Sequence, residues 1–255
     1  GSGVNLAASG YSGTLTVRTG SGLAVAGDLS FGGTVAMQSG STLSLGAGNA
    51  TLSFGNLTMD GVSIEKTGNN TKTLPGPVQI TGTSTLDVAG GGAPTSVLLS
   101  GVFSGSGSLA LTGADGATFD EGLRLSGGSN TYAGTITVGS YGRLVLDLDG
   151  SLPTTGSFAS LVVEQDGLLT IGTGAGSADI LVDALTLYNS ATFLNDVIPL
   201  GTTYTDANLP AEYSGVVSFD DAESSISSNE RPPVPEPAGL GLIGLALLGL
   251  KKKRS

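Results

Sequence analysis

Residues able to do chemistry are few in this chain, and most of them are carboxylates. The 255 residues include no His and no Cys, so catalysis would need Asp, Glu, Lys, Arg or Tyr as nucleophile or base. Two acids that flank a glycosidic bond are typical of a glycoside hydrolase. Four groups of acids lie close together in the sequence: Asp120 with Glu121, Asp147 with Asp149, Glu164 with Asp166, and Asp220 with Asp221 and Glu223.

Asp147 and Asp149 are the strongest candidates, for catalysis and for weak metal binding alike. They alternate with leucines, so they are expected on the solvent face of a half-buried strand, which is an ordinary structural position. The DLDG segment at 147–150 fails as a calcium loop, because its first and last ligand positions would be Val145 and Gly156. We therefore expect no catalytic residues, no resident metal and no cofactor.

Polysaccharide binding or degradation stays open as an alternative that uses surface carboxylates. β-Helices host polysaccharide hydrolases and lyases, and Arg124 and Arg143 are cations that would suit an anionic sugar. Catalysis of this kind requires that Asp120, Asp147 and Glu164 fall on adjacent coils within reach of one sugar. Scattered acids would instead favour a non-enzymatic protein.

The elements that would position these residues are short β-strands. Apolar residues recur in pairs two positions apart, each pair closed by Gly, Ser, Asn or Asp, which predicts strands with one buried face. The high Gly content, 43 residues, and only 5% aromatic residues argue against a sandwich or barrel. Residues 1–219 therefore read as an all-β domain, a β-solenoid of about 20 residues per coil with Gly at the corners.

The last 22 residues have a three-part order that indicates a sorting tail. The thirteen apolar residues 238–250 are fewer than the roughly 20 of a typical transmembrane helix. Length alone would favour a buried core helix or a signal-type segment. The cations that follow decide against this, because the positive-inside rule assigns them to the cytoplasmic side, so we expect a short transmembrane helix. The tail comprises the motif Val234, Pro235, Glu236 and Pro237, the helix over 238–250, and a basic end of Lys251, Lys252, Lys253 and Arg254.

This tail, residues 234–255, resembles the PEP-CTERM sorting signal of Gram-negative bacteria that produce exopolysaccharide. The resemblance implies recognition by exosortase, a membrane protease, and removal of the tail near Pro-Glu-Pro. The protein would then pass through a transient inner-membrane stage to the cell surface or extracellular matrix. Because the chain begins Gly1-Ser2-Gly3 without a secretory signal, we expect it to be a fragment or a processed form.

A second resemblance covers residues 126–171, which look like an autotransporter-associated β-strand repeat. Its most specific step is Asn130-Thr131-Tyr132-x-Gly134, followed by Thr-x-Val. The resemblance implies a right-handed parallel β-helix of the kind found in secreted and surface passenger proteins. The chain would then be a surface protein whose anchor is the sorting tail.

The net charge of the chain indicates which partners are possible. The net charge is −11, and removing residues 238–255 with their four cations leaves 6 basic and 21 acidic residues, or −15. Nucleic acid is therefore excluded as an expected partner, because phosphate binding needs clustered cations.

Residues 220–233 are acidic, Ser-rich and nearly free of apolar side chains, which predicts a disordered linker that leaves the sorting motif accessible.

Together these features predict a non-enzymatic surface or matrix protein with a role in biofilm structure, the exopolysaccharide matrix or adhesion. Its expected partners are exosortase, the inner membrane during sorting, and exopolysaccharide. The polysaccharide-binding or polysaccharide-degrading alternative stays open, and so does a third interpretation, in which the chain is the stalk fragment of a larger adhesin.

Overall fold

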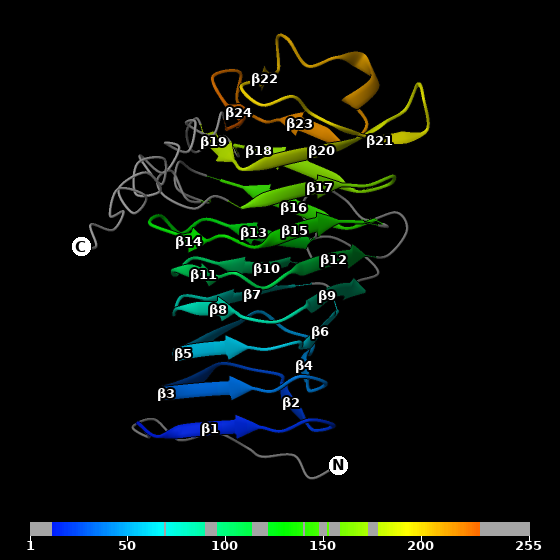
Figure 1. Cartoon of the computed structure of the whole chain (residues 1–255). Helices are drawn as coiled ribbons and strands as arrows, with labels where there is room; N and C mark the ends of the chain where they lie inside the picture. The colour runs from blue at the N-terminus through cyan, green and yellow to red at the C-terminus, as the bar shows by residue number, and fades with distance from the viewer. Residues whose placement is uncertain are drawn as a thin grey trace, which may run out of the picture.

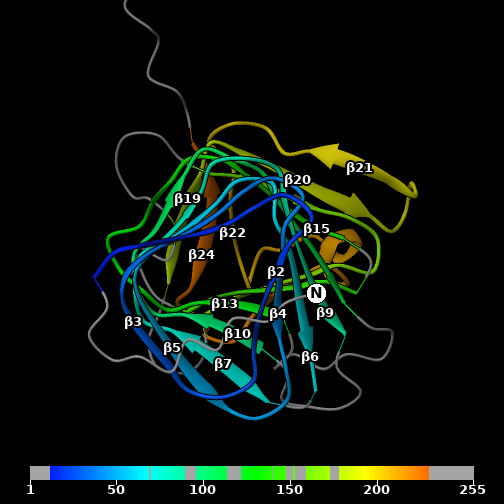
Figure 2. The same ribbon diagram turned by 90° about the horizontal axis from the view of Figure 1, so that it is seen from below.

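Stacked parallel strands form the body of the protein. A computed structural model describes residues 12–68, 70–89, 96–113, 122–139, 141–147, 152, 159–172 and 178–229. Successive coils rise from the N-terminal end to a cap at the C-terminal end (Figure 1). Seen along the stack, the strands line the sides of one elongated core (Figure 2). The fold is therefore an all-β parallel β-solenoid, as the alternating pattern predicted.

The strands of the described coils lie on three faces, and each strand on a face pairs in parallel with the strand one coil away. Face one contains β1 (Thr14–Val17), β3 (Leu29–Met37), β5 (Ala50–Met59), β8 (Val78–Ile80), β11 (Phe103–Gly105) and β14 (Thr131–Tyr132). Face two contains β2 (Gly22–Val25), β4 (Thr42–Leu45), β6 (Ser63–Thr67), β9 (Ser84–Ala89), β12 (Leu109–Gly113), β15 (Thr135–Val138), β17 (Ser160–Val163) and β20 (Ala184–Asn189). Face three begins with the first residues of β3 and β5 and continues through β7 (Thr71–Leu74), β10 (Ser96–Leu99), β13 (Gly122–Leu125), β16 (Arg143–Leu146), β18 (Leu168–Ile171) and β23 (Val217–Phe219).

The coils lengthen along the stack up to β15 and shorten slightly beyond it. On face two, Leu43 pairs with Leu23, 20 positions earlier, whereas Ile136 pairs with Leu109, 27 positions earlier. The expectation of about 20 residues per coil therefore fits the first coils and is too short for the later ones. The added residues lie between strands, so the inward alternation of the faces is preserved.

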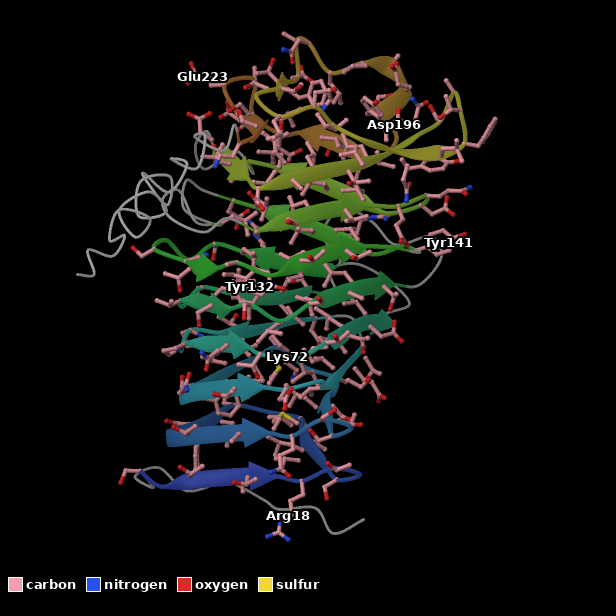
Figure 3. The ribbon with its side chains drawn as sticks, viewed as in Figure 1. Arg18, Lys72, Tyr132, Tyr141, Asp196 and Glu223 are labelled. Atoms are coloured by element: carbon pink, nitrogen blue, oxygen red, sulfur yellow. The ribbon has the colours of Figure 1, made fainter. Side chains whose placement is uncertain are left out.

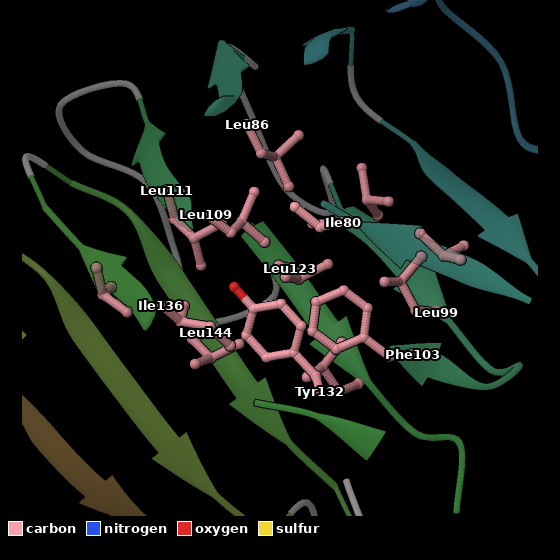
Figure 4. Packing of buried hydrophobic residues seen from close by; sticks show 14 of the residues in the cluster. Ile80, Leu86, Leu99, Phe103, Leu109, Leu111, Leu123, Tyr132, Ile136 and Leu144 are labelled. Atoms are coloured by element: carbon pink, nitrogen blue, oxygen red, sulfur yellow. The ribbon is translucent and has the colours of Figure 1, made fainter. Parts of the chain in front are cut away.

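The core is one continuous column of inward side chains. Leucine, isoleucine and valine from the three faces stack on the equivalent residues of the next coil, and Phe103 and Tyr132 stack with ring centroids 4.4 Å apart (Figure 4). The enclosed void among the apolar side chains amounts to only about 20 Å³. Around this void the interior is filled by apolar side chains of the described coils.

Antiparallel strands close the C-terminal end of the stack. β21 (Leu194–Val197) pairs with β20, and β22 (Thr203–Thr205) pairs with β24 (Ser225–Ser228), whose other neighbour is β19 (Asp179–Val182). A short 3-10 helix, η1 (Ala211–Tyr213), lies between β22 and β23. We refer to residues 190–229 as the cap.

The expectation of a disordered linker over 220–233 is wrong for its first part. Residues 225–228 form β24, which pairs in parallel with β19, and Ile226 is fully buried. A segment with a single inward apolar residue is ordered here because the neighbouring strands satisfy its backbone hydrogen bonds. Low apolar content alone therefore did not indicate disorder.

The expected transmembrane helix over 238–250 lies outside the described residues, and so do the sorting motif and the basic end. Among the residues that the structure describes, no helix is long and apolar enough to cross a membrane.

Candidate functional site

Asp147, the strongest predicted carboxylate, has a structural partner. It is buried rather than exposed, and its Oδ2 accepts a hydrogen bond from Nε of Arg124 at 2.6 Å. Arg124 alternates with the inward-facing Leu123 and Leu125, so Asp147 lies on the outer face as expected, and only its expected exposure to solvent is wrong. The pair joins neighbouring coils, since β13 and β16 are adjacent on face three. Asp149 lies outside the described residues.

The other predicted acids do not gather around Asp147. Glu164 follows β17 and precedes β18, whereas Asp147 follows β16, so the two lie beyond opposite ends of the paired strands β16 and β18. Asp120 and Glu121 lie outside the described residues. Within the part of the chain that the structure describes, no three acidic side chains are grouped so that they could hold a metal ion.

A surface pocket brings together residues that the sequence left separate. It has a volume of about 350 Å³ and lies where the chain turns from face two to face three, next to the cap. Nη1 of Arg143 donates to the carbonyl oxygens of Gly142 and Asp166, each at 3.0 Å, which holds the guanidinium against this corner. The lining residues are Tyr141, Arg143, Asp166, Gly167, Leu168, Ser214, Gly215 and Ser218.

Tyr141 and Asp166 share an unusual backbone conformation at this corner. Their φ angles are 60° and 62°, and the amide of Tyr141 donates to the carbonyl oxygen of Asp166 at 3.1 Å. At the same corner of earlier coils the left-handed residues are Gly48 and Gly68, for which this conformation carries no steric cost. The chain therefore places an aromatic residue at a strained position on the pocket rim, where Figure 3 shows Tyr141 projecting outward.

Two lysines lie inside the solenoid. Lys66 and Lys72 are fully buried, and Nζ of Lys66 donates to the carbonyl oxygens of Thr67 and Gly68, each at 2.8 Å. Nζ of Lys72 reaches back to the carbonyl oxygen of Ala26 at 3.0 Å. Burial, and then the charge of Lys72, lowers the pKa of Lys66 to about 8. These ammonium groups satisfy carbonyls near coil corners, which explains why charged residues are tolerated there.

Sequence reasoning missed both lysines although a signal was present. Lys66 lies two positions after Ile64 on β6, and Lys72 lies two positions before Leu74 on β7, so alternation places each on the buried face. Figure 3 shows Lys72 within the stack.

The Asn-Thr-Tyr-x-Gly step is a contact between coils. Oδ1 of Asn130 accepts from the amide of Phe103 at 2.6 Å, and the hydroxyl of Tyr132 donates to the carbonyl oxygen of Gly107 at 2.6 Å. At Gly134 a Cβ would overlap the carbonyl oxygen of Gly107, so only glycine fits there. The motif residues thus have structural roles in joining one coil to the coil before it.

The described chain ends in the cap. Oγ of Ser228 donates to the carbonyl oxygen of Pro199 at 2.6 Å, and the amide of Gly201 donates to the carbonyl oxygen of Ser228 at 2.8 Å. The sorting tail is therefore attached to the end of the stack that is opposite the N-terminal coils (Figure 1).

The described residues define a parallel β-solenoid, and the sequence continues from its cap into an apolar tail with a basic end. Comparison with protein-family models matches residues 233–255 to the PEP-CTERM protein-sorting motif. The chain thus carries this motif, as the sequence predicted, and the motif indicates exosortase-dependent export and sorting to the cell surface. No curated protein and no solved structure matches the chain.

Proposed function

We propose that this protein is a non-enzymatic structural component of the cell surface or extracellular matrix of a Gram-negative bacterium, where it contributes to biofilm structure or adhesion. The tail inserts transiently into the inner membrane, and exosortase cleaves the chain near Val234–Pro237. The PEP-CTERM motif at the end of a solenoid is the observation that carries this proposal. The coils are of the autotransporter-associated type, with an acidic surface that faces the exopolysaccharide matrix.

Host genetics tests the proposal. The full chain, behind a secretory signal, is expressed in a host that contains exosortase and in the same host without it. We expect release from the membrane fraction only where the protease is present, and loss of release in Glu236→Ala. Glu223→Ala, an acid in the cap, is the matched control and should be released normally. Equal release from both hosts would contradict the proposal.

The pocket beside Tyr141 supports a second candidate function, carbohydrate binding. An aromatic ring, a guanidinium and a carboxylate around 350 Å³ suit one or two sugar units of a matrix polysaccharide. Calorimetric titration with the host exopolysaccharide tests this function. Tyr141→Ala should weaken binding at least tenfold, and Arg18→Ala, at the opposite end of the stack (Figure 3), should not change it. Unchanged binding by Tyr141→Ala would contradict it.

A further inference from the structure

Exposed apolar side chains are concentrated in one part of the cap. Among the described residues, large apolar side chains that are strongly exposed are few, and most of them fall within eight consecutive positions. Their exposed fractions are 74% for Phe193, 66% for Leu194, 75% for Val197 and 55% for Leu200. We call these four residues the apolar strip. Val102, with 40% exposed, is the remaining large hydrophobic residue of this kind and lies before β11 on an earlier coil.

The apolar strip is held by a defined hairpin. β21 pairs antiparallel with β20 and ends the sheet of face two, and the hairpin extends sideways from the stack (Figures 1 and 2). Oδ1 of Asn189 accepts from the amides of Ala191 and Thr192 in the turn, and its Nδ2 donates to Asp196 at 2.6 Å. Phe193 adopts a φ of 60°, a conformation that is costly for an aromatic residue. The exposure of the strip is therefore fixed by the local structure.

The strip lies beside the point from which the tail continues. Ser228 is hydrogen-bonded to Pro199 and Gly201, the two neighbours of Leu200. Only the eight residues 230–237 separate Asn229 from the apolar segment at 238–250. Eight residues span at most about 28 Å when fully extended. Once the tail is inserted, the cap is thus held within that distance of the membrane.

The composition of the cap favours a hydrophobic rather than an electrostatic contact with a membrane. Residues 184–229 include no Lys or Arg, but they include several acids, so attraction to anionic headgroups cannot drive binding. Phe, Leu and Val side chains instead gain free energy by leaving water for the boundary between headgroups and acyl chains. The inserted tail brings the bilayer close to the cap, and the apolar strip is the apolar surface of the cap that could contact it.

We propose that the apolar strip is a membrane-contact site, which sits in the bilayer interface while the tail is inserted and orients the solenoid for cleavage. This inference rests on the proposed function, because the tail provides the proximity. The contact is weak once the tail is removed, so cleavage releases the solenoid from the membrane.

Tryptophan fluorescence tests the inference, because the chain has no Trp. Full-length Phe193→Trp is reconstituted with vesicles of phosphatidylcholine, either ordinary or brominated in the acyl chains. Bromine should quench Trp at position 193 at least twofold, with a blue-shifted emission and little dependence on salt. Full-length Val102→Trp is the control and should be neither quenched nor shifted.

The outcomes separate the two proposals. If the protein floats with the vesicles but Trp at 193 is not quenched, the membrane-contact site is wrong and tail insertion stands. If the protein does not float, tail insertion and the contact site both fail. Shielding of Trp at 193 from iodide without vesicles, rising with protein concentration and lost in Leu194→Ser/Val197→Ser, would overturn the inference in favour of contact with a second copy.

Discussion

The side chain of Asn130 holds the backbone of Phe103, which lies one coil earlier in the stack. Its Oδ1 accepts from the amide of Phe103 at 2.6 Å, and its Nδ2 donates to the carbonyl oxygen of Gly127 at 2.9 Å. Asn130 is buried, so without this contact neither its side-chain amide nor the amide of Phe103 would have water as a hydrogen-bond partner. The side chain of Asn130 thus fixes the distance and register between these two coils.

Asn130→Ala should lower the free energy of unfolding by about 1–3 kcal/mol, because the buried amide of Phe103 loses its acceptor. Denaturant unfolding followed by circular dichroism measures the change. Asn56→Ala is the matched control, since the side chain of Asn56 donates to the side chain of Thr58 on a partly exposed surface, and it should cost less than about 0.5 kcal/mol. Equal costs would show that the contact between coils contributes nothing.

Tyr132→Phe should cost about 1–2 kcal/mol of unfolding free energy. The stacked ring remains against Phe103, but the carbonyl oxygens of Gly107 and Thr135 lose the hydroxyl that donates to them. Tyr132→Ala should cost about 3–5 kcal/mol, because it also leaves a cavity. Tyr141→Phe at the pocket rim should change stability by less than about 0.5 kcal/mol, and a larger loss there than at Tyr132 would be inconsistent with the core packing.

Stability should rise with pH just above neutrality because of Lys66. The pKa of Lys66 is about 8 in the folded protein and about 10.5 when unfolded. Between these values the unfolded chain binds the proton and the folded protein does not, so the free energy of unfolding increases with pH. We expect a gain of about 2 kcal/mol between pH 8 and pH 9.5 in denaturant titrations. Lys66→Met should flatten this dependence, and an unchanged slope in that variant would refute the assignment.

The ion pair between Arg124 and Asp147 should show coupling in a double-mutant cycle. Arg124→Met removes the guanidinium from a buried carboxylate, and we expect a loss of about 1–3 kcal/mol. The coupling with Asp147→Asn should be about 1 kcal/mol, because the side chain of Arg124 is 39% exposed. Additive effects of the two substitutions would argue against a structural role for Asp147.

Alternation of apolar residues was sufficient to predict the strands. Leu43 and Leu45, like Leu109 and Leu111, are buried on the same side of their strands because side chains alternate across a strand. The rule does not predict that Asp147 is buried beside Arg124, nor that Ser225–Ser228, with one apolar residue, is ordered by pairing with its neighbours.

The pocket could not be predicted from the sequence. Tyr141, Asp166 and Ser214 are far apart in the chain, and only the register of β16 with β18, together with the fold of the cap, brings them together. Arg143 and Asp166 were identified individually, but nothing in their local sequence indicates a shared surface. The sorting tail was predictable because its order of motif, apolar segment and basic end is contained in contiguous residues.

The intact mass of the protein recovered from the cell surface of a host with exosortase tests the central claim most directly. A C-terminus near Glu236, without the apolar segment and basic end, is the result we predict. Mature surface protein that retains the complete C-terminus through Ser255 would contradict sorting by cleavage.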